Sequence, residues 1–255
     1  EWIVEGQPSI NIAAFDVNRF GGYADKHYAV ARLSSGHAFA SAAYYPHVEA
    51  PEGRPGWTTP LYDRLAAKGA VFGAVNGWEV ANWFAPKGEK AGDIHSYERT
   101  NWHSHVVAEV RAMREGVGII DWSSAGKFEI AGPGAAHALE QLSAAPLPKI
   151  GEYRPYLFLN SKGKLTAVMH IGCLAEDRFY AVGAPINAHR DEHCLRNGMN
   201  GSAAITALSS RWGALALIGP KAEKLIAAAF GETFESQAPG TVRDVGLRNI
   251  PRSEE

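Results

Sequence analysis

Two segments of the sequence combine residue types that could do chemistry. The segment from His189 to His193 (HRDEH) has the H-x-x-E-H spacing, which places two imidazoles on one face of a helix, as in zinc peptidases. A third ligand would have to come from Glu223 or Glu232, which lie far along the chain. The same five residues also fit a charged helix surface. We therefore interpret the segment as surface and predict no metal site.

The second segment, Gly132 to His137 (GPGAAH), begins like a dinucleotide-binding fingerprint. His137 occupies the place of the last glycine, and Pro133 lacks the N–H that would face a phosphate. We interpret it as a strand-to-helix corner. His103 and His105 could chelate a metal or accept a proton, and we expect them to be solvated at the start of a helix.

Composition excludes several classes of partner. The 255 residues are 46% hydrophobic and 20% charged, with a net charge of −2, which gives no reason to expect nucleic acid or an anionic membrane. No apolar run approaches the ~20 residues that a membrane span needs. The two cysteines do not make a disulfide framework and indicate a reducing, cytoplasmic compartment.

The elements that would position any site are organised around a unit that the chain contains twice. Residues 118–142 and 212–230 each predict a strand, a Gly-Pro break and a helix. In the first unit we expect Pro133 at the first helical position, where its missing N–H costs nothing.

The strand of the first unit alternates in polarity. Phe128 and Ile130 fall on one face, and Lys127 and Glu129 fall on the other, which is the pattern of a half-buried strand. We therefore expect the lysine and the glutamate to face solvent.

Other patterns complete an α+β prediction with mainly antiparallel sheets and flanking helices. Thr59 suits the N-cap and Pro60 the first position of a helix that ends at Gly69. The further predicted elements are helices at 24–33, 104–115 (with Val106, Val107, Val110 and Met113 on its buried side) and 186–195, and strands at 11–20, 70–72, 156–160, 165–174, 179–183 and 203–208.

The polar run Lys87 to Asp93 (KGEKAGD) is the best domain boundary, dividing the chain at residue 90. Residues 1–6 resemble the last turn of a helix, and residues 241–250 start like a strand. We expect the chain to be a fragment.

Long stretches of the sequence resemble one enzyme family. Residues 58–86 (TTPLYDRLAAKGAVFGAVNGWEVANWFAP) are similar to the central segment of dimethylglycine/sarcosine dehydrogenase-type flavoproteins. Residues 97–102 (YERTNW) and 110–135 resemble the start of their second half, which is similar to the glycine-cleavage T-protein, a folate-binding aminomethyltransferase. Residues 159–165 (LNSKGKL) and 174–184 (LAEDRFYAVGA) continue the match.

The resemblance implies a domain organisation and a function. Residues 1–90 would be the central segment of an FAD-dependent oxidoreductase, incomplete at its N-terminus, and residues 91–255 a T-protein-like folate-binding domain, incomplete at its C-terminus. The parent enzyme would demethylate a small N-methylated amine, with tetrahydrofolate accepting the one-carbon unit. FAD would belong to the parent and not to this chain, which could associate as an oligomer or with a partner FAD subunit.

The resemblance also places a candidate site. The family's catalytic Asp falls at Val168, which can neither accept a proton nor balance a cation, and His170 on the same side of the strand could substitute. The implied folate-binding residues are Val168, Ala181, Val182 and Gly183. The alternative is a non-catalytic T-protein-like module that binds a ligand or a partner.

Overall fold

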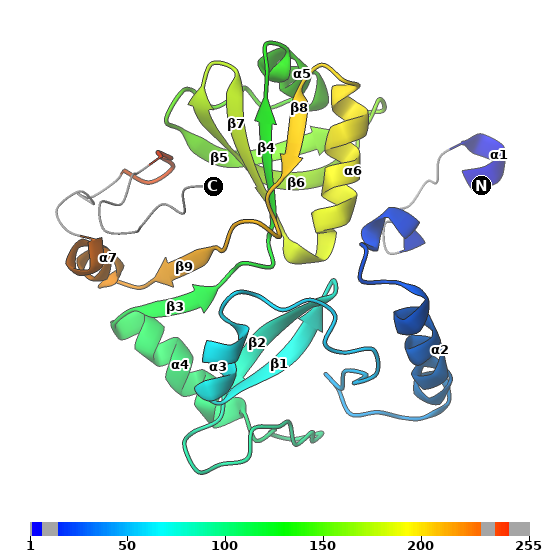
Figure 1. Ribbon diagram of the computed structural model, residues 1–255, viewed down its shortest axis with the longest axis vertical. Helices are drawn as coiled ribbons and strands as arrows, with labels where there is room; N and C mark the ends of the chain where they lie inside the picture. The colour runs from blue at the N-terminus through cyan, green and yellow to red at the C-terminus, as the bar shows by residue number, and fades with distance from the viewer. Residues whose placement is uncertain (1, 7–14, 231–237, 245–255) are drawn as a thin grey trace, which may run out of the picture.

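The computed structural model describes residues 2–6, 15–230 and 238–244 of the chain (Figure 1). A five-stranded antiparallel sheet forms one body with two helices, and a two-stranded sheet with its own helices forms the other. A second two-stranded sheet lies between them (Figure 1). The predicted α+β class with mainly antiparallel sheets is confirmed.

The strands make three sheets in the order β5-β6-β7-β4-β8, β1-β2 and β3-β9. They are β1 (Ala70–Val75), β2 (Trp78–Phe84), β3 (Gly118–Asp121), β4 (Gly126–Ala131), β5 (Tyr153–Leu159), β6 (Leu165–Ala175), β7 (Arg178–Gly183), β8 (Ala204–Ala207) and β9 (Leu215–Ile218). The helices are α1 (Trp2–Glu5), α2 (Lys26–Ser41), α3 (Tyr62–Ala67), α4 (His103–Glu115), α5 (Ala135–Leu142), α6 (Ala188–Met199) and α7 (Ala222–Phe230), with 3-10 turns η2 (Val17–Arg19) and η3 (Pro185–Asn187).

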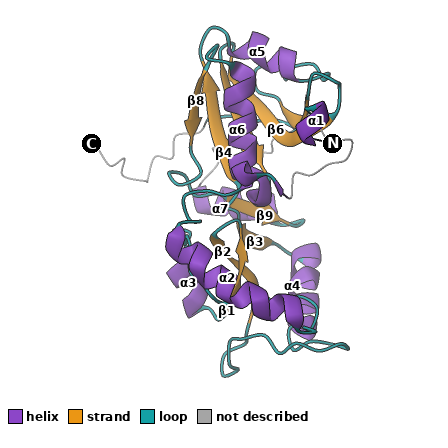
Figure 2. Ribbon diagram, turned by 90° about the vertical axis from the view of Figure 1, so that its right-hand side faces the viewer, coloured by secondary structure: helices purple, strands orange, loops and turns teal. Residues whose placement is uncertain are grey.

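The main core lies between the five-stranded sheet and helices α5 and α6 (Figure 2). Alternate side chains of the strands enter it, as period-2 geometry requires. Two paired glycines, Gly126 and Gly183, let the first turn of α6 approach the sheet. A Cβ at Gly183 would lie 2.6 Å from Asp191 Oδ2, and one at Gly126 would lie 3.1 Å from Ala188 Cα. The core residues are Phe128, Ile130, Ala135, Ala138, Leu139, Tyr156, Phe158, Ala167, Met169, Ile171, Cys173, Phe179, Ala181, Leu195 and Met199.

Strand β4 corrects the expectation that Lys127 faces solvent. Phe128 and Ile130 enter the core as predicted, but Lys127, on the opposite face, is only 1% exposed. Its Nζ donates to the carbonyl oxygens of Ser123 (2.6 Å) and Ala125 (3.0 Å), which replace water as hydrogen-bond partners. Burial lowers the pKa of Lys127 to about 8, against a small opposing effect of Asp121. The turn that precedes β4 supplies these carbonyl groups, so it covers the polar face at Lys127, whereas Glu129 on the same face stays partly exposed.

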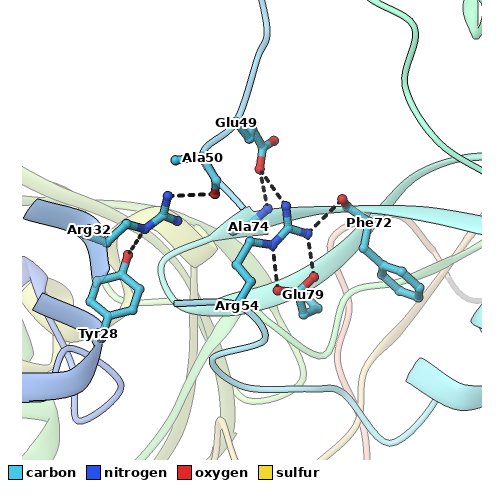
Figure 3. A network of polar contacts seen from close by, with 8 residues as sticks. All are labelled: Tyr28, Arg32, Glu49, Ala50, Arg54, Phe72, Ala74 and Glu79. Carbon is cyan, nitrogen blue, oxygen red and sulfur yellow. Dashed lines mark hydrogen bonds and ion pairs between the residues drawn. The ribbon is translucent and has the colours of Figure 1, made fainter. Parts of the chain in front are cut away.

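The β1–β2 hairpin is fixed by one partly buried guanidinium (Figure 3). Arg54 binds both carboxylate oxygens of Glu79 (2.9 and 2.6 Å) and the carbonyl oxygen of Phe72 (2.8 Å). Glu49 accepts from the Ala74 N–H at 2.7 Å and faces Arg54 at 3.6 Å. Charge-assisted, two-pronged contacts of this kind are strong and directional. They hold the loop before Trp57 against the hairpin.

Helix α3 begins later than the sequence pattern predicts. Leu61 occupies the N-cap position without a side-chain cap, and α3 starts at Tyr62, so the expected roles of Thr59 and Pro60 are wrong. The Thr59 hydroxyl instead donates to Asp121 Oδ2 at 2.5 Å, which ties the segment before α3 to β3. A long-range acceptor competes here with the local cap.

Helix α4 also differs from its predicted burial. Val107, which we expected on its buried side, is exposed, whereas Val106 packs against Trp83 and its neighbours. Glu109 accepts the Phe84 N–H at 3.0 Å, so α4 contacts β2 across the predicted boundary at residue 90. That boundary stays a prediction.

The two strand–Gly-Pro–helix units share one turn geometry. Gly132 and Gly219 have φ of +124° and +130°, values that only glycine adopts easily. In each unit the first helical N–H, at Ala135 or Ala222, donates to the carbonyl of that glycine at 2.9 or 3.0 Å. Pro133 therefore lies in the turn, two residues before the helix, and not at the first helical position.

The predictions near the termini are only partly tested. The expected strand at 11–20 falls partly outside the described residues, and residues 17–19 form η2 instead. Thr241 makes an isolated antiparallel bridge with Glu152, and the rest of the predicted strand from 245 onward lies outside the described residues. Residues 2–5 are helical and Gly6 has a positive φ of +73°, as expected of a helix end.

Candidate functional site

The face of the five-stranded sheet opposite α5 and α6 is the candidate ligand-binding surface, called here the open face. It is built from the second set of alternating side chains of β5, β6 and β7. Leu157 lies opposite Val168, and His170 lies opposite Val182, across adjacent strands. Val168 is 46% exposed, although it is apolar. The open face therefore presents apolar surface that a flat ligand could cover.

Two ring pairs line the same face. Tyr153 stacks on His170 with centroids 5.2 Å apart and planes 13° apart, and Tyr180 stacks on Trp212 at 5.8 Å and 29°. Burial raises the pKa of Tyr180 to about 12 and also raises the pKa of Tyr153. Both phenols are therefore neutral at physiological pH and can donate hydrogen bonds.

One border of the open face is covered by the chain itself. The Tyr153 N–H donates to the Gly240 carbonyl at 2.6 Å, and Val242 lies over Gly172. A Cβ at Gly172 would be 3.0 Å from Val242 Cγ1, so the glycine makes room for the crossing segment. The end of the face around Val168 stays open.

The structure divides the four residues that the sequence grouped as folate-binding. Val168 and Val182 lie on the open face. Ala181 is fully buried in the core, and Gly183 faces Asp191 of α6. The Ala181 side chain and the side of Gly183 that faces Asp191 therefore point away from the open face, because successive residues of a strand point to opposite faces. The folate-binding role of these two residues stays a prediction.

The acid–base groups of the open face are sparse. His170 is exposed and shares the face with Val168, two residues away, as strand geometry requires. Glu129, on β4, is paired with Arg178 at 2.6 Å, which also binds Asp244 at 3.0 Å. Val168 itself supplies no group that could move a proton, so His170 is the titratable side chain next to it.

The HRDEH segment lies in the first half of α6, and its side chains point in different directions instead of converging on one site. His189 packs against Trp57 (5.5 Å between centroids) and Tyr23 (6.3 Å), and burial lowers its pKa. Glu192 binds Arg196, and His193 contacts Asn197 on the exposed side. Within residues 2–6, 15–230 and 238–244, no three His, Cys, Asp or Glu side chains are grouped to hold a metal ion. Glu232 lies outside these residues.

The histidines at the start of α4 behave differently from each other. His103 is exposed, as expected, but His105 stacks on Trp83 at 5.5 Å with planes 8° apart and faces Glu89 at 3.5 Å. The expectation that His105 is solvated is therefore wrong. Its role in the structure is packing at the helix start.

Sequence reasoning missed a buried carboxyl, Asp191. It is 1% exposed, neither of its oxygens has a hydrogen-bond partner within the described chain, and burial raises its pKa to about 7, opposed by Arg190. The signal was present in the sequence: Asp191 falls between Ala188 and Leu195 in the i, i+3, i+7 positions of the face that α6 buries.

Comparison with known proteins identifies the family to which this architecture belongs. The GCVT N-terminal domain family matches residues 61–251. The 4-methylaminobutanoate oxidase (formaldehyde-forming) of Paenarthrobacter nicotinovorans is 33% identical over 93% of this chain and 29% of its own length. Human mitochondrial dimethylglycine dehydrogenase is 28% identical over 98% of this chain and 30% of its own length. The chain therefore spans about three tenths of these relatives.

A solved structure agrees with the sequence comparison. The glycine cleavage system aminomethyltransferase T of Bartonella henselae superposes with a TM-score of 0.57 at 28% identity, covering 68% of this chain and 43% of that chain. The chain therefore has an aminomethyltransferase-like α+β fold. The chain belongs to the GCVT N-terminal domain family. Its resemblance to dimethylglycine/sarcosine dehydrogenase-type proteins is confirmed.

The described helices also bear on membrane association. None of them combines the length and the apolar character that crossing a bilayer requires.

Proposed function

We propose that this chain is the folate-handling part of an FAD-dependent oxidoreductase that demethylates a small N-methylated amine of the dimethylglycine or sarcosine type. The observation that carries the proposal is the match of more than nine tenths of the chain to oxidases and dehydrogenases of such amines. The flavin would be held by another domain or a partner subunit. The two unbridged cysteines, Cys173 and Cys194, support a cytoplasmic location.

The open face fits the ring system of tetrahydrofolate. Val168 and Val182 would contact one side of the pterin, and the neutral phenol of Tyr180 would donate a hydrogen bond at its edge. The apolar surface and the stacked rings supply contact area and exclude water. Bound tetrahydrofolate would supply the amine nitrogen that accepts a one-carbon unit.

The open face fits ring binding better than it fits proton transfer. A carboxylate beside the reacting nitrogen would balance developing positive charge and accept a proton. Val168 has no such group, and His170 is the nearby side chain that could accept a proton in its neutral form. We therefore assign His170 the role of proton acceptor in this proposal.

A titration of the 255-residue chain with tetrahydrofolate tests the binding part. We expect saturable binding that Val182→Glu weakens at least tenfold, since a charge placed under the ring would be desolvated. The matched control is Val107→Glu, because Val107 is exposed on α4, away from the sheet. Binding that both variants leave intact would remove the open face as the folate site.

A second candidate function is a non-catalytic binding module. The absence of a proton-accepting group at Val168 favours it. The module would bind folate or a partner without transferring a one-carbon unit. In a flavin-containing parent, one-carbon transfer that His170→Ala abolishes supports the enzyme, and binding without transfer supports the module. Val168→Asp asks whether a carboxylate at this position restores transfer. An unchanged rate would show that the acid does not act here.

A further inference from the structure

A cavity of about 500 Å³ lies on the opposite side of the sheet from the open face, where α6 begins. Its walls come from four distant segments: the loop before α3, the start of β2, the sheet, and the first turns of α6. The side chains that matter here are Trp57, Trp78, Phe128, His189, Ser209 and Ser210. Phe128 faces α6, which fixes the side of the sheet on which the cavity lies.

The aromatic wall is held rigidly by the backbone. The Trp57 N–H donates to the Gly77 carbonyl at 2.6 Å, and the Glu79 N–H donates to the Trp57 carbonyl at 2.8 Å. Trp57 therefore forms an isolated parallel bridge with Trp78 of β2, and its ring lies 5.3 Å from that of Trp78. A cavity whose walls are fixed before binding loses little freedom when a ligand enters.

Glycines make the rear of this wall possible. A Cβ at Gly21 would lie 2.1 Å from His189 Nε2, and one at Gly56 would lie 2.5 Å from the Gly77 carbonyl oxygen. The segment around Gly21 thus closes over His189, which in turn packs on Trp57 at 5.5 Å. Close approaches at two separate glycines indicate that the wall is built by the fold and is not a chance gap.

The polar groups of the cavity favour an uncharged ligand. Glu192 is paired with Arg196 (3.0 and 2.8 Å), and His189 is neutral because burial lowers its pKa. The start of α6 carries a partial positive charge, which disfavours a cation. Ser209 Oγ accepts the Lys127 N–H at 3.0 Å and keeps its own O–H to donate.

We propose that this cavity binds a planar, uncharged nitrogen heteroaromatic ring of the purine or pteridine type. Trp57 and Trp78 supply a face for stacking, and the hydroxyls of Ser209 and Ser210 meet ring nitrogens or carbonyl groups at the edge. A volume of about 500 Å³ holds a two-ring system with its substituent. The site is separate from the open face, so the inference does not depend on folate binding there.

Calorimetric titration of the 255-residue chain tests the proposal, with adenosine as the purine probe and 6-hydroxymethylpterin as the pteridine probe. We expect saturable one-to-one binding of at least one probe. Trp57→Ala should raise its Kd tenfold or more, in line with the contribution of one stacking partner. Ser210→Trp, a change at an exposed rim position, should block entry while leaving the fold intact. Val107→Glu, at an exposed position of α4 away from the cavity and the open face, is the control that should leave Kd unchanged.

The alternative results are equally definite. Binding lost in Val182→Glu and kept in both cavity variants would place the ring on the open face and overturn the inference. Binding of tetramethylammonium in place of both probes would show a cation site and overturn it as well. Absence of saturable binding in the folded chain, checked by its circular dichroism, would also overturn it. None of these results depends on one-carbon transfer.

Discussion

Helices α5 and α7 both follow a strand through the same Gly-Pro turn, yet one is part of the core and the other is not. Ala135, Ala138 and Leu139 of α5 are buried against the sheet and α6. Helix α7 buries no residue completely, and Phe230 at its end is 47% exposed. Figure 1 shows α7 beside β9, away from the five-stranded sheet.

The comparison shows that the Gly-Pro turn is set by the local sequence, whereas the burial of the helix that follows it is not. The N–H of the first helical residue bonds to the glycine carbonyl in both units, because the glycine and proline fix the backbone there. What the helix then covers depends on the neighbouring strands. Strand β4 has partners on both sides, β7 and β8, whereas β9 pairs only with β3 in the described residues.

Truncating matched leucines gives the largest expected contrast. Leu139→Ala in α5 should cost about 2–5 kcal/mol of unfolding free energy, because Leu139 is fully buried and its removal leaves a cavity. Leu225→Ala in α7 should cost about 1 kcal/mol or less, because Leu225 is only half-buried. Urea unfolding measures both. Equal losses would break the distinction between the two units.

For the turn glycines, the larger loss of stability is expected in the second unit, at Gly219, and the smaller one in the first unit, at Gly132. Gly219→Ala should cost about 3 kcal/mol, because its Cβ would lie 2.4 Å from the carbonyl oxygens of both Gly116 and Met113. Gly132→Ala should cost about 1 kcal/mol, from the positive φ alone, since the nearest atom is 3.9 Å away. Hydrogen exchange at Ala222 and Ala135, with urea unfolding, follows each unit separately. A larger loss for Gly132→Ala would show that the surroundings of the turn do not set its cost.

The helix-covered side of the five-stranded sheet also holds a buried carboxyl, Asp191, whose oxygens have no hydrogen-bond partner in the described residues. The variant Asp191→Asn removes its titration. The pKa of Asp191 is about 7 in the folded chain, so between pH 4 and pH 7 the folded state binds more protons than the unfolded state. The unfolding free energy of the wild type should therefore fall as pH rises through this range. Asn does not titrate, so the variant should gain about 4 kcal/mol above pH 7 and nothing near pH 4. Asp177→Asn at an exposed turn is the control, and a gain independent of pH would contradict the assignment.

The smallest effect is expected on the exposed unit. Phe230→Ser should change the unfolding free energy by about 1 kcal/mol or less, because the ring is already 47% exposed to water. The variant should reduce self-association of the chain, measured by sedimentation at rising concentration, because exposed apolar surface drives association. A loss of stability similar to that of Leu139→Ala would show that α7 is packed like α5.

Much of the secondary structure could be predicted from the sequence. Helix α4 was predicted to within one residue at its start, and strands β6 and β7 follow the expected hairpin order. The helix at 24–33 extends as α2 to Ser41 and was underestimated, because its pattern has almost no apolar periodicity. The open face could be placed on the strands at 165–183, but the sequence could not divide Val182 from Ala181.

The start of α3 shows why other details could not be predicted. Thr59 followed by a proline and an apolar helix is a strong local N-cap pattern. In the structure the hydroxyl binds Asp121, 62 residues away. A side chain with one hydrogen to donate responds to the acceptor that the fold brings closest, and no local window contains that acceptor.

The sequence by itself determined the α+β class, the two Gly-Pro turns and the family. These depend on residue type and on spacing over a few residues, where backbone sterics act. Only the tertiary structure decided that Lys127 and Asp191 are buried, that Ala181 faces the core, and that Trp57 joins His189 in one cavity wall. Burial and contact depend on which segments pack together, and that packing is set by the whole chain at once.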